Sequence, residues 1–276
     1  MSERFIVTLT SYGQRLHTLP VVLDSIYAQS VPPDKVVLNL AHDEGIPEEV
    51  QQYIDGKGIE VFYTKSTKVY KKLIPTLRRY PNDLVMSIDD DWIYPKGMIE
   101  EFLDVHKRYP NHPVSGNHIV EHGMACHCGC ASLTKAEFMG DFLNTVDCEE
   151  LMQKCPCDDI AYSFFSVKSG FPYVRTENEY WFNMEPAVSG EGYSAEMNRI
   201  GGIDASMKYL VEKYGELPPF ALAYVDDPSI ARILDDIHLQ QQEAARMEIR
   251  TTARYRLGNA LLAPSALLKR LRRRKT

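Results

Sequence analysis

Short apolar runs alternate with amphipathic helical segments along residues 5–109 of this 276-residue chain, and this alternation constrains the fold more than any other feature. Four runs rich in aliphatic and β-branched residues indicate buried strands, and segments with apolar residues at helical spacing separate them. Parallel neighbouring strands need such crossover helices. The pattern therefore predicts an α/β fold with a mostly parallel, Rossmann-like sheet flanked by helices. The expected strands span 5–9, 36–40, 59–63 and 84–88, and the expected helices begin near Thr18, Pro47, Leu73 and Pro95.

Three consecutive carboxylates, Asp89, Asp90 and Asp91, follow the fourth predicted strand. Side chains alternate along extended backbone, so we expect Asp89 and Asp91 on one side and Asp90 on the other. Acids crowded at the end of an apolar strand repel each other, and a bound divalent cation relieves that repulsion. Carboxylate oxygens suit Mg²⁺ or Mn²⁺ better than zinc or copper. The alternative is a solvated acidic turn that caps the next helix.

Other charged residues follow the neighbouring strands. Arg15 follows the first strand, Asp43 and Glu44 follow the second, and the lysine-rich segment 65–72 precedes the fourth. In parallel sheets, ligands bind beyond the carboxyl ends of the strands, where these loops gather. We therefore expect the acidic triplet, Arg15, Asp43 and the lysines to form one binding site.

Charge and composition exclude several classes of protein. A formal net charge of -7 argues against binding of the whole domain to nucleic acid. Hydrophobic residues make up 44% of the chain and charged residues 25%, which is typical of a soluble globular protein. No run of about 20 apolar residues is present to span a bilayer, and no basic leader precedes the first strand. We expect a cytoplasmic protein.

The sequence predicts two parts, an α/β domain over residues 1–225 and a C-terminal helical extension over 226–276. The end of the extension, 261–275, is basic and amphipathic, in contrast to the acidic body. One interpretation is a helix lying on anionic lipid at the inner face of the plasma membrane, where each cation contributes about 1 kcal/mol. A frayed, solvated end is the equal alternative.

All six cysteines lie between Cys126 and Cys157. Buried free thiols are the preferred interpretation, because disulfides are rare in the cytoplasm. Zinc binding is the alternative, although the C-x-C-x-C and C-P-C spacings differ from the two-residue gap of common structural sites. The segment 114–133, which also holds three histidines, is predicted to be irregular.

Asp158 and Asp159 precede a predicted helix over 160–168. Pro156 before the helix and Gly170 after it are ordinary start and stop signals. The simplest interpretation is that both acids stabilise the start of the helix. The functional interpretation adds that a carboxylate held there, beside the binding site, can act as a general base.

The order of these motifs resembles that of the GT-A nucleotide-diphosphosugar glycosyltransferases, particularly bacterial enzymes of the family 2 type. The resemblance extends over roughly residues 1–170 and is weaker afterwards. It depends on the segments 7–12, 25–30, 72–77, 87–91 and 158–159. One segment departs from the family, because residues 42–45 read His-Asp-Glu-Gly where Asp-Asp-Gly-Ser is usual.

The resemblance implies a GT-A fold and a role for each motif. Asp91, helped by Asp89, is expected to bind Mn²⁺ or Mg²⁺ at the donor diphosphate, with Asp90 near the ribose. The family's base is usually the second acid of a pair that opens a helix, so Asp159 is the candidate and Asp158 its rival. The other residues expected to contact the nucleotide are Thr8, Ser11, Tyr12 and Arg15, with Asp43 near the base and Lys72 near the base or a phosphate.

These residues predict an inverting, metal-dependent glycosyltransferase. It would move a sugar from a nucleotide-diphosphate donor, most commonly a UDP-sugar, to a hydroxyl of a glycan or lipid-linked glycan in bacterial surface polysaccharide synthesis. A metal and basic side chains stabilise the departing diphosphate, and a carboxylate takes the acceptor proton. Nucleotidyl transfer to sugar phosphates ranks second, because the loop 10–15 holds only Gly13 where a glycine-rich loop is usual. A non-catalytic, zinc-stapled binding module ranks third.

Overall fold

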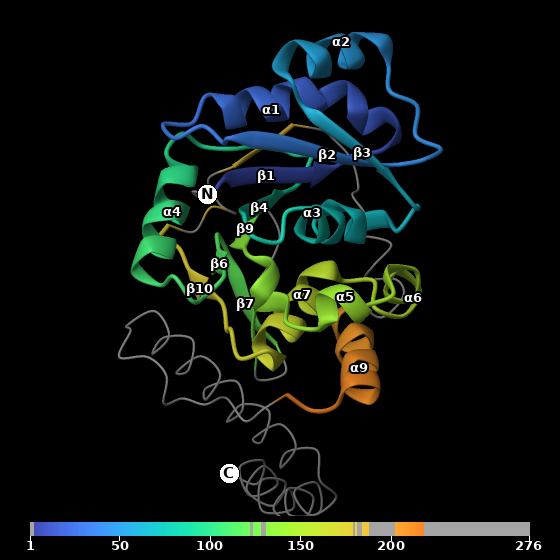
Figure 1. Cartoon of the computed structure of the whole chain (residues 1–276), viewed down its shortest axis with the longest axis vertical. Coiled ribbons are helices and arrows are strands. Elements are labelled where there is room, and N and C mark those ends of the chain that lie inside the picture. The colour runs from blue at the N-terminus through green and yellow to red at the C-terminus, as the bar shows by residue number, and fades with distance from the viewer. Residues whose placement is uncertain are drawn as a thin grey trace, which may run out of the picture.

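The computed structural model describes residues 3–121, 124–127, 131–178, 180, 184–187 and 202–217. Its main sheet has seven strands in the order β10-β6-β9-β4-β1-β2-β3 (Figure 1). These strands are β1 (Phe5–Thr10), β2 (Lys35–Ala41), β3 (Glu60–Thr64), β4 (Leu84–Ile88), β6 (Val114–Ser115), β9 (Ala131–Thr134) and β10 (Val174–Arg175).

Strand β1 lies at the centre of the parallel part of the sheet. It pairs in parallel with β2 and β4, and β2 pairs in parallel with β3. Strand β9 runs the other way, because it pairs antiparallel with both β4 and β6. The carboxyl ends of β1, β2 and β4 therefore meet at one edge of the sheet. The prediction of an α/β fold with a mostly parallel, Rossmann-like sheet flanked by helices is confirmed.

Helices cover both faces of the sheet (Figure 1). One face packs against α1 (Leu19–Tyr27), α2 (Glu48–Lys57) and α4 (Met98–Arg108). The hydrophobic cluster on the other face includes residues of α3 (Ile74–Arg79), α5 (Phe142–Thr145), α6 (Cys148–Lys154), α7 (Asp158–Lys168) and α9 (Gly202–Tyr214), and α9 packs against α6 and α7.

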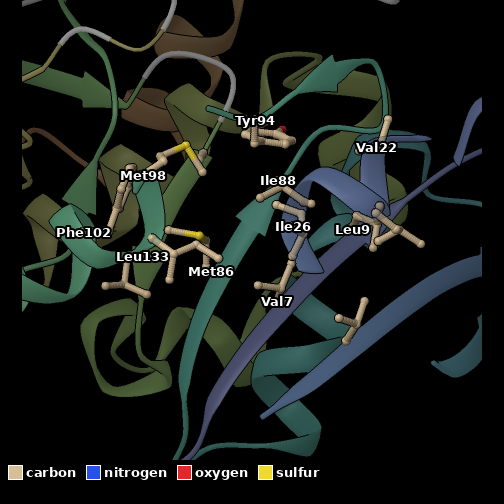
Figure 2. Packing of buried hydrophobic residues seen from close by; sticks show 14 of the residues in the cluster. Val7, Leu9, Val22, Ile26, Met86, Ile88, Tyr94, Met98, Phe102 and Leu133 are labelled. Atoms are coloured by element: carbon tan, nitrogen blue, oxygen red, sulfur yellow. The ribbon is translucent and has the colours of Figure 1, made fainter. Parts of the chain in front are cut away.

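Alternation along the central strands builds two hydrophobic cores. Val7 on β1 and Met86 on β4 belong to the cluster on the α1 side, which Figure 2 shows. Their sequence neighbours Ile6 and Val85 belong to the cluster on the α7 side. Such strands, buried on both faces, are mostly apolar and do not alternate with polar residues, and this is why the sequence located them.

The prediction that residues 114–133 are irregular is wrong. They include β6, β9 and an antiparallel hairpin of β7 (His118–Glu121) and β8 (Met124–His127). These strands have two to four residues each, which is too short for a clear period-two pattern among glycines and cysteines. The side chains of residues 118–130 are outside the described part, and so are the zinc ligands proposed there.

Several sequence predictions lie outside the described residues. They include the helical extension over 226–276 and its basic segment 261–275. Within the described residues, no helix is both long and apolar enough to cross a membrane.

Burial lowers the pKa of His106 on α4, and the nearby Lys135 ammonium lowers it further. In the unfolded chain this pKa returns to about 6.5, so below that pH the unfolded state binds more protons than the folded state. We expect the free energy of unfolding, measured with urea, to fall as the pH drops from about 7.5 to about 5.5. His106→Leu should weaken this dependence, whereas replacement of the exposed His42 should not. An unchanged slope in His106→Leu would contradict the prediction.

Candidate functional site

The acidic triplet leaves strand β4 instead of extending it. Strand β4 ends at Ile88, and the triplet connects it to the short strand β5 (Trp92–Ile93). Asp90 accepts hydrogen bonds from Ser11 Oγ at 2.6 Å and Arg15 Nη1 at 2.8 Å. Asp91 Oδ2 lies 3.1 Å from Nη2 of the same arginine. The prediction that Asp90 points away from Asp91 is therefore wrong, because the alternation of an extended strand stops at Ile88.

A second cation, Lys72, joins the remaining acid of the triplet to helix α7. Its Nζ lies 2.9 Å from Asp89 Oδ1 and 3.2 Å from Asp158 Oδ2. Burial opposes the charge on this lysine, but Asp158 and Asp89 together hold its pKa well above the usual value. Lys72 therefore stays charged. Arg15 and Lys72 each bridge two carboxylates.

The carboxylates of the triplet differ in their electrostatics. Burial raises the pKa of Asp90, although Ser11 and Arg15 oppose the shift. Burial and the charge of Asp89 raise the pKa of Asp91 to about 6, again against the pull of Arg15. The charged form of Asp91 is thus under-stabilised by its protein neighbours, and a bound cation would favour it.

One oxygen of the triplet is placed to receive such a cation. Asp91 Oδ1 is buried and has no hydrogen-bond partner among the described residues. No three His, Cys, Asp or Glu side chains of the described part form a cluster that could hold a metal. Mg²⁺ is usually held by one or two carboxylates together with substrate phosphates and water. The residues therefore fit Mg²⁺ or Mn²⁺ at Asp91 and Asp89 when a diphosphate completes the coordination.

Tyr94, which the sequence reasoning missed, fixes the backbone of the triplet. Its hydroxyl accepts a hydrogen bond from the Asp89 amide at 2.8 Å and donates to the Asp89 carbonyl at 3.1 Å. Helix α1 holds the same segment, because Ser25 Oγ accepts from the Tyr94 amide and Gln29 donates to the Pro95 carbonyl. The motif at 25–30 therefore positions the triplet.

The other residues expected at the nucleotide divide into buried and exposed groups. Thr8 is fully buried, and its hydroxyl forms hydrogen bonds with the Lys72 carbonyl and the Thr76 hydroxyl. It therefore holds the backbone of Lys72 in place. Tyr12 is 45% exposed, with its ring 5.4 Å from the Arg15 guanidinium. Asp43 is exposed beyond the end of β2. Of these three, only Tyr12 and Asp43 have an exposed side chain, and their contacts with a nucleotide stay a prediction.

Lys71 was expected at the site only as one of the lysines of the segment 65–72, without a role of its own. It is 3% exposed and makes no ion pair within the described part of the chain. Burial lowers its pKa, against the attraction of Glu44, Asp90 and Asp43. In the sequence, Lys71 and Lys72 are simply two adjacent lysines. Only the tertiary structure shows that Lys72 pairs with acids and that Lys71 does not, within the described part of the chain.

Asp158 and Asp159 share the first turn of α7 but differ in environment. Asp158 is buried, and burial raises its pKa while the ion pair with Lys72 opposes the shift. Asp159 is half-buried. The two acids follow Cys157, which with Cys155 is a buried free thiol, while Cys148 is a half-buried free thiol. These three cysteines form no disulfide, and the preference for free thiols over zinc stays a prediction.

The chain matches no protein-family model and no curated protein. Among solved structures, it is similar to glucosyl-3-phosphoglycerate synthase from Mycobacterium tuberculosis in complex with Mn²⁺ and uridine diphosphate, at 12% identity and a TM-score of 0.46, over 79% of this chain and 82% of that one. It is also similar to 4-diphosphocytidyl-2C-methyl-D-erythritol synthase, at 12% identity and a TM-score of 0.39, over 56% of this chain and 85% of that one. Values this low assign neither a family nor an activity.

Proposed function

We propose that this protein is a metal-dependent glycosyltransferase of the GT-A type. It moves a sugar from a nucleotide-diphosphate donor, with UDP-sugars first among the candidates, to a hydroxyl of a glycan or lipid-linked glycan in surface polysaccharide synthesis. The observation that carries the proposal is the acidic triplet at the end of β4. Asp91 there keeps one buried oxygen without a hydrogen-bond partner among the described residues, and Lys72 links Asp89 to the acids that open α7.

Donor binding is proposed for the loops that follow β1 and β2. The exposed ring of Tyr12 offers a flat apolar face to a nucleobase. Lys71, which has no ion pair in the described part of the chain, offers a cation to a phosphate and gains a partner when the donor binds. Lys72 already has two carboxylate partners, so we move the proposed phosphate contact from Lys72 to Lys71.

Cleavage of a sugar-phosphate bond builds negative charge on the leaving diphosphate. A bound Mn²⁺ or Mg²⁺ supplies the positive charge that neutralises the phosphate oxygens. Asp91 and Asp89 would hold this ion. Arg15 keeps Asp90 and Asp91 in place through contacts at 2.8 and 3.1 Å, so the acids do not reorganise as the reaction proceeds.

Asp159 is the proposed general base. It removes the proton from the acceptor hydroxyl as that oxygen attacks the anomeric carbon. A base on the opposite side from the leaving group gives inversion at that carbon. Asp158 is less suited, because it is buried and its carboxylate is already engaged by the Lys72 ammonium at 3.2 Å, whereas Asp159 is half-buried.

Asp91→Asn is the test of the metal role. We expect kcat/KM for Mn²⁺-dependent release of UDP from a UDP-sugar to fall by at least about 100-fold, because the leaving group loses several kcal/mol of charge stabilisation. Mn²⁺ binding in the presence of UDP, measured by calorimetry, should weaken in parallel.

Asp104→Asn is the matched control, because Asp104 forms an exposed ion pair with Lys107 on α4. It should leave both measurements unchanged. Full Mn²⁺-dependent turnover in Asp91→Asn would refute the assignment. Release of pyrophosphate from a nucleoside triphosphate, instead of a diphosphate from a nucleotide sugar, would support nucleotidyl transfer.

Replacement of the two acids of α7 separates the base from its neighbour. Asp159→Asn should lower kcat by about 10²–10⁴-fold and leave UDP binding intact, because the amide keeps the shape of the side chain but accepts no proton. Asp158→Asn should chiefly lower thermal stability, because Lys72 loses one buried partner. The reverse pattern, with catalysis lost only in a folded Asp158→Asn, would make Asp158 the base.

A further inference from the structure

Lys72 carries a buried charge that contacts acids from two separate elements. Its side chain is 8% exposed, and its Nζ reaches Asp89 at the end of β4 and Asp158 at the start of α7. Two carboxylates already balance the single charge of this buried lysine, so a third anion would gain less attraction from it than from a cation that has no ion pair. The position of Lys72 therefore argues against a direct contact with the donor.

The backbone of Lys72 is also held. Its carbonyl accepts a hydrogen bond from Thr8 Oγ1 on β1 at 2.9 Å and lies 3.4 Å from Asn39 Nδ2 on β2. Asn39 Nδ2 also contacts Thr8 and Thr76 at 2.9 Å each. This network is fully buried, so the central strands fix the main chain from which the lysine extends.

Tyr70 provides a second contact between the same segment and α7. Both Tyr70 and Lys72 belong to the 3-10 helix η2 (Lys68–Lys72). The Tyr70 hydroxyl donates to the Cys155 carbonyl, just before α7 begins. Its ring meets Tyr162, one turn into α7, edge to face with centroids 5.9 Å apart. Helix η2 therefore holds the start of α7 on both sides of Asp158.

The start of α7 depends on such contacts. Cys157, the residue before the helix, makes no side-chain capping bond within the described chain. The first-turn acid Asp158 is buried, and a buried carboxylate without a counter-charge is strongly unfavourable. Lys72 supplies that charge and at the same time sets the distance between the first turn of α7 and Asp89.

We propose that Lys72 is a positioning residue that ties Asp89 of the acidic triplet to Asp158 of α7 and thereby fixes where Asp159 stands relative to the donor. The catalytic part of this inference rests on the proposed glycosyl transfer. The structural link from Asp89 through Lys72 to Asp158 does not depend on that activity. In this proposal the adjacent residues Lys71 and Lys72 have different roles. Lys71 faces the donor, and Lys72 holds the two halves of the site together.

The kinetic test compares Lys72→Met with Lys71→Met in the full chain. Lys72→Met should lower kcat by about 100-fold, the size of effect expected when a reacting group is misplaced by about 1 Å. Its affinity for Mn²⁺ alone, measured by calorimetry, should stay equal or become tighter, because Asp89 loses a competing cation. Lys71→Met should instead weaken Mn²⁺-dependent UDP binding by about 10-fold or more with a smaller loss of kcat at saturating donor.

Lys65→Met is the matched control, because Lys65 lies near the same segment but is 78% exposed and pairs with Glu149 on α6. It should leave kcat and both affinities unchanged. The proposal is overturned if Lys72→Met weakens UDP binding as Lys71→Met does and retains kcat, because Lys72 is then a donor contact.

A thermal unfolding cycle tests the structural link without reference to activity. Lys72→Met and Asp158→Asn should each lower Tm, and the double variant should lower it by less than the sum, because the second change removes the charge that the first left unpaired. If Lys72→Met alone fails to fold, we expect the double variant to fold, because it no longer leaves the Asp158 charge unpaired. Additive decreases in Tm would refute the structural link through Lys72, even if the enzyme is active. If the decreases are not additive but the protein transfers no sugar, the proposed function is refuted and the structural link is supported.

Discussion

Charge balance among buried and half-buried acids at the end of β4 and the start of α7 is the constraint on which the rest of this structure depends. Two cations bridge Asp89, Asp90, Asp91 and Asp158 in pairs. Arg15 bridges Asp90 and Asp91, and Lys72 bridges Asp89 and Asp158. An unpaired buried carboxylate costs several kcal/mol, so the loop after β1, helix η2 and the start of α7 adopt their places together or not at all.

The same balance leaves the site short of positive charge, which explains how it could act on a diphosphate. Two monovalent cations face four carboxylates, and the pKa of Asp91 is raised to about 6 as a result of burial and of Asp89. A divalent ion would correct the deficit and would then present its remaining charge to phosphate oxygens. Lys71 adds a cation with no ion pair in the described part of the chain. In the proposed function, Asp91 and Asp89 would hold the metal, and Lys71 would add a further cation for the donor phosphates.

The sequence predicted the features of the fold and the site that depend on local patterns, and it did not predict those that depend on contacts between distant residues. The central strands were predictable because burial on both faces leaves runs such as 84–88 apolar at every position but Ser87. The site's location followed from strand order, since residues after parallel strands must gather at one edge. The orientation of Asp90 was not predictable, because the chain leaves extended geometry at Ile88. Nor were the different partners of Lys71 and Lys72 predictable, because the two residues are adjacent in the sequence and only the tertiary structure places Lys72 beside Asp89 and Asp158.

The triplet is held from both faces of the sheet. On the α1 side, Tyr94 bonds the amide and carbonyl of Asp89, and Ser25 bonds the Tyr94 amide. On the α7 side, Lys72 bonds the Asp89 carboxylate. Main chain and side chain of one aspartate are thus fixed by separate layers, so movement of either layer would displace the acid. Electrostatic catalysis works best when charges are in place before the reaction begins. A site built at the junction of two cores meets that requirement through packing, and each added ion pair then strengthens the contact between the layers.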